Sequence, residues 1–300
     1  MLSEAPTFDA LIPAAMAEKA AQAGVKKASA SFVTLFALGV LAGAFIAIGG
    51  LFSTVATAGA AGMLPYGVIR TIAGLAFGLG LIMVVVGGAE LFTGNTLIVM
   101  AFASGKVSFS ALLRNWAIVY VSNFVGAVLT AALVFAANHH LAGQGVVGLN
   151  ILSIGEAKTG LAFMPALAAG ILCNTLVCMA VWLCFSARTT TDKILAIIPP
   201  ITAFVAASFE HSIANMYFIP LALFVKDGAP TKFWDLIQKT PADYPHLTWA
   251  NFASSLVPVT IGNIIGGAVM VGLVYWLIYL RNKPHTEPAA HPAGAPVDKR

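Results

Sequence analysis

Charged side chains are scarce in this sequence. Asp, Glu, Lys and Arg together make up 9% of its 300 residues, whereas a soluble domain carries about 25%. The short alternating segments of a membrane β-barrel are also lacking. With 59% hydrophobic residues, the composition therefore places the chain among α-helical membrane proteins.

Cysteine is rare too, and it forms no pattern. Cys173, Cys178 and Cys184 fall within one apolar run, with neither a metal-binding spacing nor an even number for disulfides. We interpret them as small packing residues.

The first 25 residues lack the basic start and apolar core of a signal peptide. The net charge of +4 comes from residues that flank apolar runs, which favours membrane topology over nucleic-acid binding.

Motifs of several enzyme and channel classes are absent. Glu210 and His211 stand side by side, yet no Gly-x-Ser-x-Gly or His-Glu-x-x-His motif accompanies them. No metal-ligand cluster is evident, so we expect neither an intramembrane enzyme nor a metal or other cofactor. The paired Asn-Pro-Ala motifs of aquaporins are missing as well, which argues against a pore for water or glycerol.

Long apolar segments occupy most of the chain. A helix of about 20 residues crosses a bilayer, and six segments reach that length: roughly 30–53, 67–101, 113–137, 161–187, 194–226 and 251–281. Residues 1–28 precede them, and their apolar residues recur at helical spacing, which predicts an amphipathic helix at the membrane surface: Phe8, Leu11, Ile12, Ala15 and Met16. The Pro- and Ala-rich tail, 284–300, is predicted to be disordered.

The distribution of Lys and Arg predicts the orientation. With a cytoplasmic N-terminus, 11 of the 16 Lys and Arg residues lie inside. The short connections 102–112 and 188–193 are both basic and both inside. The positive-inside rule therefore places both termini in the cytoplasm.

Two of the six segments are too long, and each has a polar interruption. The segment 67–101 contains "AELFTGN" and the segment 194–226 contains "FEHSIAN", so Glu90–Asn95 matches Glu210–Asn215. Irregular backbone at membrane depth survives only where protein buries it or where it lines a water-filled cavity. We therefore expect two broken helices whose loops meet near mid-membrane.

The matching extends beyond the interruptions. Asn123 and Asn263 each begin an Asn-x-x-Gly motif, in the third and sixth segments. A repeated unit of three spans must be inverted in its second copy, and inverted repeats with paired broken helices are typical of transporters and channels. We therefore predict an all-α membrane protein in which six transmembrane helices form two inverted three-helix repeats, 29–138 and 160–283, within one channel domain, 29–283.

Five stretches are specific in combination: "GAELFTGNTL" (88–97), "RNWAIVYVSNFVGA" (114–127), "ILCNTLVCMAVW" (171–182), "FEHSIANM" (209–216) and "LVPVTIGNIIGG" (256–267). They resemble the formate/nitrite transporter family over about residues 6–283, and the segment 233–252 resembles its formate-channel branch. The resemblance implies an aquaporin-like fold and a homopentamer in the lipid bilayer of a bacterial inner membrane, each protomer with its own pore. It also implies that the N-terminal helix gates the cytoplasmic mouth.

The resemblance implies which residues line the pore. His211 matches a central pore histidine, and its side chain titrates near physiological pH. Thr93 is its counterpart from the first interruption, where its hydroxyl binds a small carboxylate, caps a helix, or does both. Asn174 either orients the histidine or substrate or makes an ordinary interhelical hydrogen bond. The resemblance also implies an outer constriction at Phe77 and Phe204, and an inner one at or near Leu81, Leu91, Phe92 and Val177.

The remaining polar residues of the spans have structural or electrostatic readings. Glu90 and Glu210 are expected to accept the backbone N–H groups that broken helices leave unpaired, and Asn123 and Asn263 to tie helices together. Lys158 is expected at the outer mouth, where a cation raises the local anion concentration; an ordinary solvated lysine is the alternative.

The expected solute is a small monovalent weak-acid anion, with formate first. Nitrite, hydrosulfide, acetate and lactate stay open, because all are small monovalent anions of weak acids. Crossing an apolar constriction costs an ion its hydration. We therefore expect the anion to gather near Lys158, to accept a proton from or through His211, and to cross as the neutral acid or an anion–proton pair. Transport would then depend on pH.

Overall fold

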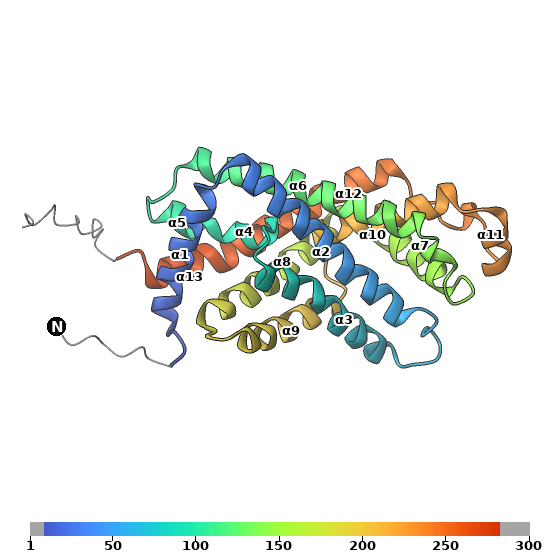
Figure 1. Ribbon diagram of the computed structural model, residues 1–300, viewed down its shortest axis with the longest axis horizontal. Helices are drawn as coiled ribbons and strands as arrows, with labels where there is room; N and C mark the ends of the chain where they lie inside the picture. The colour runs from blue at the N-terminus through green and yellow to red at the C-terminus, as the bar shows by residue number, and fades with distance from the viewer. Residues whose placement is uncertain (1–8, 283–300) are drawn as a thin grey trace, which may run out of the picture.

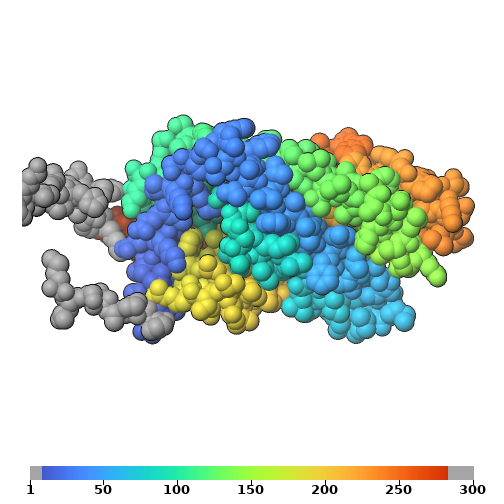
Figure 2. Space-filling model, viewed as in Figure 1, coloured from blue at the N-terminus to red at the C-terminus, as the bar shows by residue number. Residues whose placement is uncertain are grey.

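The computed structural model describes residues 9–282, which form helices and connecting turns without a β-strand (Figure 1). Phe8 of the expected amphipathic helix and the tail 284–300 lie outside the described residues. In the space-filling view the molecule is elongated, with the N-terminal helix near one end and residues around 235 at the other (Figure 2).

Six helical segments account for the crossings that the sequence predicts. Five runs are long and apolar enough to cross a membrane: α2 (Phe32–Thr57), α3 (Tyr66–Gly87), α6 (Phe109–Ala136), α8 (Phe163–Ser186) and the continuous run Trp249–Tyr279. The last run consists of α12 (Trp249–Ile264), a π-helical stretch η4 (Ile265–Leu273) and α13 (Val274–Tyr279). The sixth crossing is shared by α9 (Thr190–Ala206) and α10 (Ser212–Gly228), each of 17 residues.

Both expected breaks are present, so the predicted fold class is confirmed. After α3 the chain runs through a short irregular segment into α4 (Phe92–Asn95), η1 (Thr96–Ile98) and α5 (Val99–Ala103). Gly88 ends α3 with φ of +80°, and Ser208 follows α9 with φ of +59°. Glycine suits this left-handed conformation, whereas it is uncommon for a residue such as serine. The two equivalent turns therefore redirect the backbone at the same point of each repeat.

Close helix packing follows the same inverted repeat. A Cβ atom on Gly126 of α6 would lie 2.0 Å from the carbonyl oxygen of Val40 in α2. A Cβ atom on Gly266 in η4 would lie 2.2 Å from the carbonyl oxygen of Ile171 in α8. Small residues at such crossings let backbones approach in the absence of a hydrophobic driving force between membrane helices. The two repeats therefore share their packing as well as their breaks.

Further helices lie in the connections between crossings, on the side of the bundle away from α1. The sequence pattern does not predict them. α7 (Val146–Thr159) and α11 (Thr231–Ile237) lie with the one-turn helices η2 (His139–Leu141) and η3 (Pro241–Asp243) in connections. α7 is only 14 residues long, too short to span a bilayer, and it packs against α10. Its end carries Lys158.

α1 (Pro13–Ala28) lies at the end of the bundle opposite α11 (Figure 1). Its buried residues Met16, Ala17 and Ala20 pack in a cluster with Met100 and Trp182. Its polar face stays outside this cluster, as expected of an amphipathic helix.

Candidate functional site

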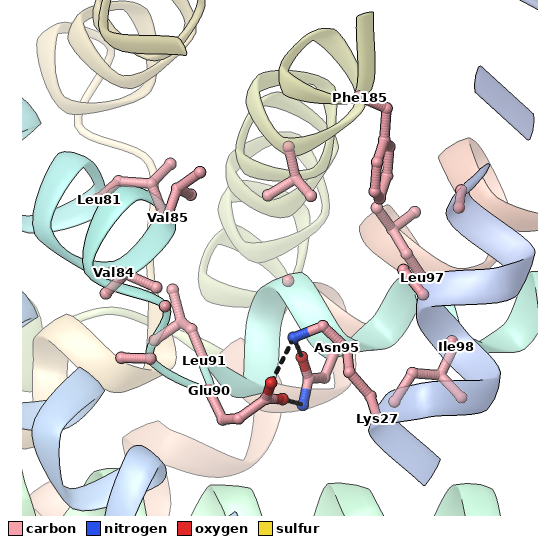
Figure 3. A pocket seen from close by; sticks show the side chains of 17 residues that line it. Lys27, Leu81, Val84, Val85, Glu90, Leu91, Asn95, Leu97, Ile98 and Phe185 are labelled. Atoms are coloured by element: carbon pink, nitrogen blue, oxygen red, sulfur yellow. Dashed lines mark hydrogen bonds and ion pairs between the residues drawn. The ribbon is translucent and has the colours of Figure 1, made fainter. Parts of the chain in front are cut away.

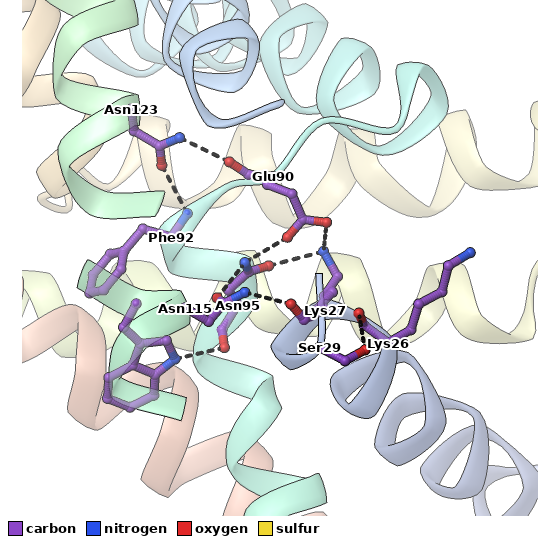
Figure 4. A network of polar contacts seen from close by, with 9 residues as sticks. Lys26, Lys27, Ser29, Glu90, Phe92, Asn95, Asn115 and Asn123 are labelled. Atoms are coloured by element: carbon purple, nitrogen blue, oxygen red, sulfur yellow. Dashed lines mark hydrogen bonds and ion pairs between the residues drawn. The ribbon is translucent and has the colours of Figure 1, made fainter. Parts of the chain in front are cut away.

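The first break is held by one asparagine from α6. The Oδ1 atom of Asn123 accepts the backbone N–H of Phe92 at 2.9 Å, the start of α4. Its Nδ2 atom donates to the carbonyl oxygens of Gly39 at 2.8 Å and Glu90 at 2.9 Å. The side chain of Asn123 is fully buried. It therefore satisfies backbone groups that the broken helix leaves unpaired and ties them to α2 (Figure 4).

The second break repeats this arrangement with Asn263 from α12. Its Oδ1 atom accepts the backbone N–H of Ser212 at 2.8 Å. Its Nδ2 atom donates to the carbonyl oxygens of Gly170 at 2.8 Å and Glu210 at 3.0 Å. Both asparagines thus tie helices together. They also accept backbone N–H groups of the broken helices, which were expected to bind the glutamates.

Glu90 is instead the centre of a side-chain network with the N-terminal helix. The Nζ atom of Lys27 donates to Glu90 Oε1 at 2.8 Å and to Asn95 Oδ1 at 3.0 Å. Asn95 Nδ2 donates to Glu90 Oε2 at 2.7 Å and also bonds Asn115 Oδ1 at 2.9 Å. Figure 4 shows these side chains converging from α1, α4 and α6. The network joins α1 to the first break.

Glu210 has the equivalent partners in the second repeat. Lys158 Nζ donates to both carboxylate oxygens of Glu210, at 2.9 and 3.0 Å. Asn215 Nδ2 donates to Glu210 Oε2 at 2.7 Å. No partner among the described residues reaches Asn215 Oδ1. Lys158 is therefore neither an ordinary solvated lysine nor a free cation, because a largely buried carboxylate neutralises its charge.

His211 and Thr93 come together between the two breaks. The Thr93 Oγ1 and His211 Nε2 atoms are 3.0 Å apart, and both side chains are buried. The Nδ1 atom of His211 accepts the backbone N–H of Ala214 at 3.0 Å, which caps α10. A nitrogen that accepts this bond carries no proton. The geometry therefore assigns a neutral ring whose Nε2–H donates to Thr93.

Asn174 supports Thr93 without touching the histidine. Its Nδ2 atom donates to the carbonyl oxygens of Thr93 at 3.2 Å and Asn263 at 2.6 Å. Thr96 Oγ1 donates to the same Thr93 carbonyl at 2.6 Å. Thr93 lies inside α4, so it is not the capping residue of that helix. Asn174 thus fixes the backbone that presents the Thr93 hydroxyl to His211.

Two cavities lie beside the two breaks: His211 lines one of them, and Gly94, the residue after Thr93, lines the other. One, which we call the Lys27 cavity, has a volume of about 220 Å³ and is lined by Lys27, Glu90 and Leu91, among others. Apolar side chains dominate it, with the ion pair at its edge (Figure 3). The other, the Lys158 cavity, has a volume of about 370 Å³, and Lys158 and His211 belong to its lining. The two cavities share no lining residue.

The side chains expected at the constrictions fall into three groups. Phe77 and Phe204 line the Lys158 cavity and meet edge to face, with ring centroids 5.6 Å apart. Leu81 and Leu91 line the Lys27 cavity. Phe92 packs on Trp116 and Tyr120, and Val177 is buried in the core. Neither Phe92 nor Val177 belongs to the lining of either cavity.

Sequence reasoning did not identify Lys27 and Arg70 as site residues. Lys27 stands five residues before the start of α2, and Lys158 stands five residues before the start of α8. That spacing is a signal in the repeat that could have found Lys27. Arg70, which lines the Lys158 cavity, has no comparable signal.

Comparison with known proteins gives consistent matches over nearly the whole chain. The sequence model of the family described as "Formate/nitrite transporter" matches residues 14–277. The chain is 45% identical to the formate channel FocA of Escherichia coli over 279 residues, which is 93% of this chain and 98% of that protein. It is 39% identical to the formate channel FocA of Haemophilus influenzae over 265 residues, covering 88% of this chain and 93% of that one.

Solved structures agree. One described as a pentameric formate channel with formate bound superposes with a TM-score of 0.79 at 46% identity, covering 83% of this chain and 98% of that chain. An ion channel of the same family superposes with a TM-score of 0.75 at 27% identity, covering 88% and 98%.

Proposed function

Because the chain belongs to the formate/nitrite transporter family, we propose that it is a pH-dependent formate channel. The protein is a multi-pass membrane transport protein and not an enzyme, as its relatives are named channels and transporters. The channel would be a homopentamer in the bacterial inner membrane, with both termini in the cytoplasm and one pore in each protomer. A relative of similar sequence forms a pentameric formate channel.

One observation carries the proposal. The Thr93–His211 contact joins a hydroxyl and a ring nitrogen at 3.0 Å, from the two broken crossings. His211 lines the Lys158 cavity, and Gly94, next to Thr93, lines the Lys27 cavity. A carboxylate that enters from the Lys158 cavity would take the place of the Thr93 oxygen as acceptor of the His211 Nε2–H. The Thr93 hydroxyl would then rotate to donate to the same carboxylate.

The hydrogen bond at Nδ1 sets the condition for proton transfer. If His211 gave its Nε2 proton to formate alone, the ring would become an anion. A second proton must therefore reach Nδ1, and it must displace the Ala214 N–H that Nδ1 now accepts. Losing such a hydrogen bond costs about 0.5–1.5 kcal/mol. Proton transfer through His211 is then favoured mainly at low pH. A low external pH would therefore favour uptake.

The apolar side chains account for the need for a proton. Phe77 and Phe204 on one side and Leu81 and Leu91 on the other offer no hydrogen bond to an anion. Formate would cross them as formic acid or as an anion–proton pair, because neutralisation removes most of the desolvation cost. Nitrite, hydrosulfide, acetate and lactate obey the same chemistry and are the competing solutes.

The test is formate flux across a pH series in proteoliposomes. We expect His211→Phe to abolish the pH dependence, because Phe keeps the aromatic volume but has no ring nitrogen. His139→Phe is the matched control, since that histidine lies in η2 and lines neither cavity. An unchanged pH profile in His211→Phe would overturn the relay. Competition by nitrite, hydrosulfide, acetate and lactate on the same preparation would rank the solutes.

A further inference from the structure

The Lys158 cavity carries a positive charge that its ion pair does not neutralise. Its charged or titratable lining residues in the described chain are Arg70, Lys158, Glu210 and His211. Lys158 and Glu210 neutralise each other at 2.9 Å. His211 is neutral when Nδ1 accepts the Ala214 N–H. The charge that remains is that of Arg70.

Arg70 is anchored but not paired. Its Nη2 atom donates to the backbone carbonyl of Val205, the residue after Phe204. Its Nε atom is buried and has no partner within residues 9–282. No carboxylate of those residues forms a salt bridge with it. A guanidinium has five N–H donors, so most of its donors remain available beside the aromatic constriction.

The opposite cavity has no equivalent charge. Lys27 and Glu90 are the charged residues of the described chain that line it, and they pair at 2.8 Å. Gly88 and Ser208 are equivalent positions of the two repeats. Counting back equally from each, Thr190 stands where Arg70 stands in the first repeat. Among the described residues that line the two cavities, the uncompensated cation therefore belongs to the Lys158 cavity.

We propose that Arg70 is an anion-capture site of the Lys158 cavity, which binds a small monovalent carboxylate before it reaches Thr93 and His211. The identity of the anion rests on the function proposed above. A guanidinium matches a carboxylate with two parallel hydrogen bonds. Its free charge in a cleft with apolar walls concentrates anions there. Because the Lys27 cavity lacks such a charge, capture would lower the KM for entry from the Lys158 side alone.

The experiment measures labelled formate entry into right-side-out and into everted membrane vesicles, from a host without its own formate channels. We expect Arg70→Gln to raise the KM about 10-fold in the vesicles whose Lys158 cavity faces the added formate, and to leave the KM of the other vesicles unchanged. A roughly 10-fold effect is at the low end of the range for electrostatic concentration of a ligand. Arg70→Lys keeps the charge but loses the two parallel hydrogen bonds, so its KM should lie between those of the wild type and Arg70→Gln. Arg114→Gln is the matched control, because Arg114 lines neither cavity.

Formate binding is measured in parallel, by the line broadening of carbon-13-labelled formate with the purified protein in nanodiscs. If the line broadening depends on Arg70 but the protein transports no formate, capture is supported and the channel proposal is overturned. An unchanged KM and unchanged broadening in Arg70→Gln would overturn capture, whatever the wild type transports. If Arg70→Lys were as impaired as Arg70→Gln, the positive charge of Arg70 would contribute nothing to the KM, and electrostatic capture would be overturned.

Discussion

Lys27 and Lys158 each stand five residues before the first helix of a repeat, and each forms an ion pair with the glutamate of a break. The distances from Nζ to the nearest carboxylate oxygen are 2.8 Å for Lys27–Glu90 and 2.9 Å for Lys158–Glu210. The pairs differ in exposure, since the side chain of Lys27 is 33% exposed and that of Lys158 15%. Each break is thus fixed from outside its own helix, by α1 in one repeat and by α7 in the other.

The two ion pairs should differ in their contribution to stability. Lys158→Met leaves Glu210 buried without its cation, and breaking a buried pair costs about 3–5 kcal/mol. Lys27→Met should cost less, because solvent reaches the remaining Glu90 more easily. Thermal unfolding of the detergent-solubilised variants measures the difference. The double variant Lys158→Met/Glu210→Gln should recover part of the loss; if it unfolds at the temperature of Lys158→Met, the pair is not the cause.

The Thr93 hydroxyl should matter more than its methyl group. Thr93→Val keeps the shape but removes the hydroxyl that would donate to the bound carboxylate, whereas Thr93→Ser keeps that hydroxyl. One hydrogen bond contributes about 1 kcal/mol, so formate flux should fall roughly 5- to 10-fold in Thr93→Val and little in Thr93→Ser. Flux in proteoliposomes at equal protein content measures both. Equal flux in the two variants would argue against a role for the hydroxyl.

Phe204 should select solutes by size. Phe204→Ala removes the edge-to-face contact with Phe77, at 5.6 Å between centroids, and opens space beside His211. We expect acetate and lactate flux to rise relative to formate flux by several-fold, with a stability loss of about 3–5 kcal/mol. Val177→Ala is the comparison, because Val177 lines neither cavity. Parallel flux measurements with the three acids give the ratio, and an unchanged ratio would remove Phe204 from the constriction.

His140 should make stability depend on pH. It lies in η2, in the connection between two crossings, and it stacks on Phe135 and meets Phe233 edge on. Burial, and then the neighbouring His139, lowers the pKa of His140 below its ordinary 6.5. As pH falls through 6.5 the unfolded chain binds a proton that the folded chain does not, so stability is lost below that pH.

His140→Phe keeps the aromatic packing and removes the titrating group. The melting temperature between pH 7.5 and 5 should therefore fall less in His140→Phe than in the wild type. His139→Phe should give an intermediate profile, because His139 contributes, after burial, to lowering the pKa of His140. Identical pH profiles of the wild type and His140→Phe would show that another group governs acid stability.

The breaks were predictable because the sequence repeats them. Glu90–Asn95 and Glu210–Asn215 recur within over-long apolar segments, and Asn123 and Asn263 recur in the following crossings. A polar residue in a membrane must find a partner, so two matching sets imply two matching sites. The pattern did not predict the hydrogen-bond partner of each polar group. The expectation that the glutamates bind backbone N–H groups was wrong, because Asn123 Oδ1 and Asn263 Oδ1 take those positions.

The sequence by itself determined the crossings, the paired breaks and the family, since apolar length and repeated motifs are properties of the chain alone. Only the tertiary structure decided which charged side chains are paired and which are not. Lys158 reads as a free cation in the sequence, but a carboxylate 52 positions away neutralises it. Arg70 reads as one more loop-proximal arginine, but it is left without an acidic partner in the described chain. Electrostatic pairing depends on distances of a few ångströms between segments far apart in the chain, which sequence spacing does not fix.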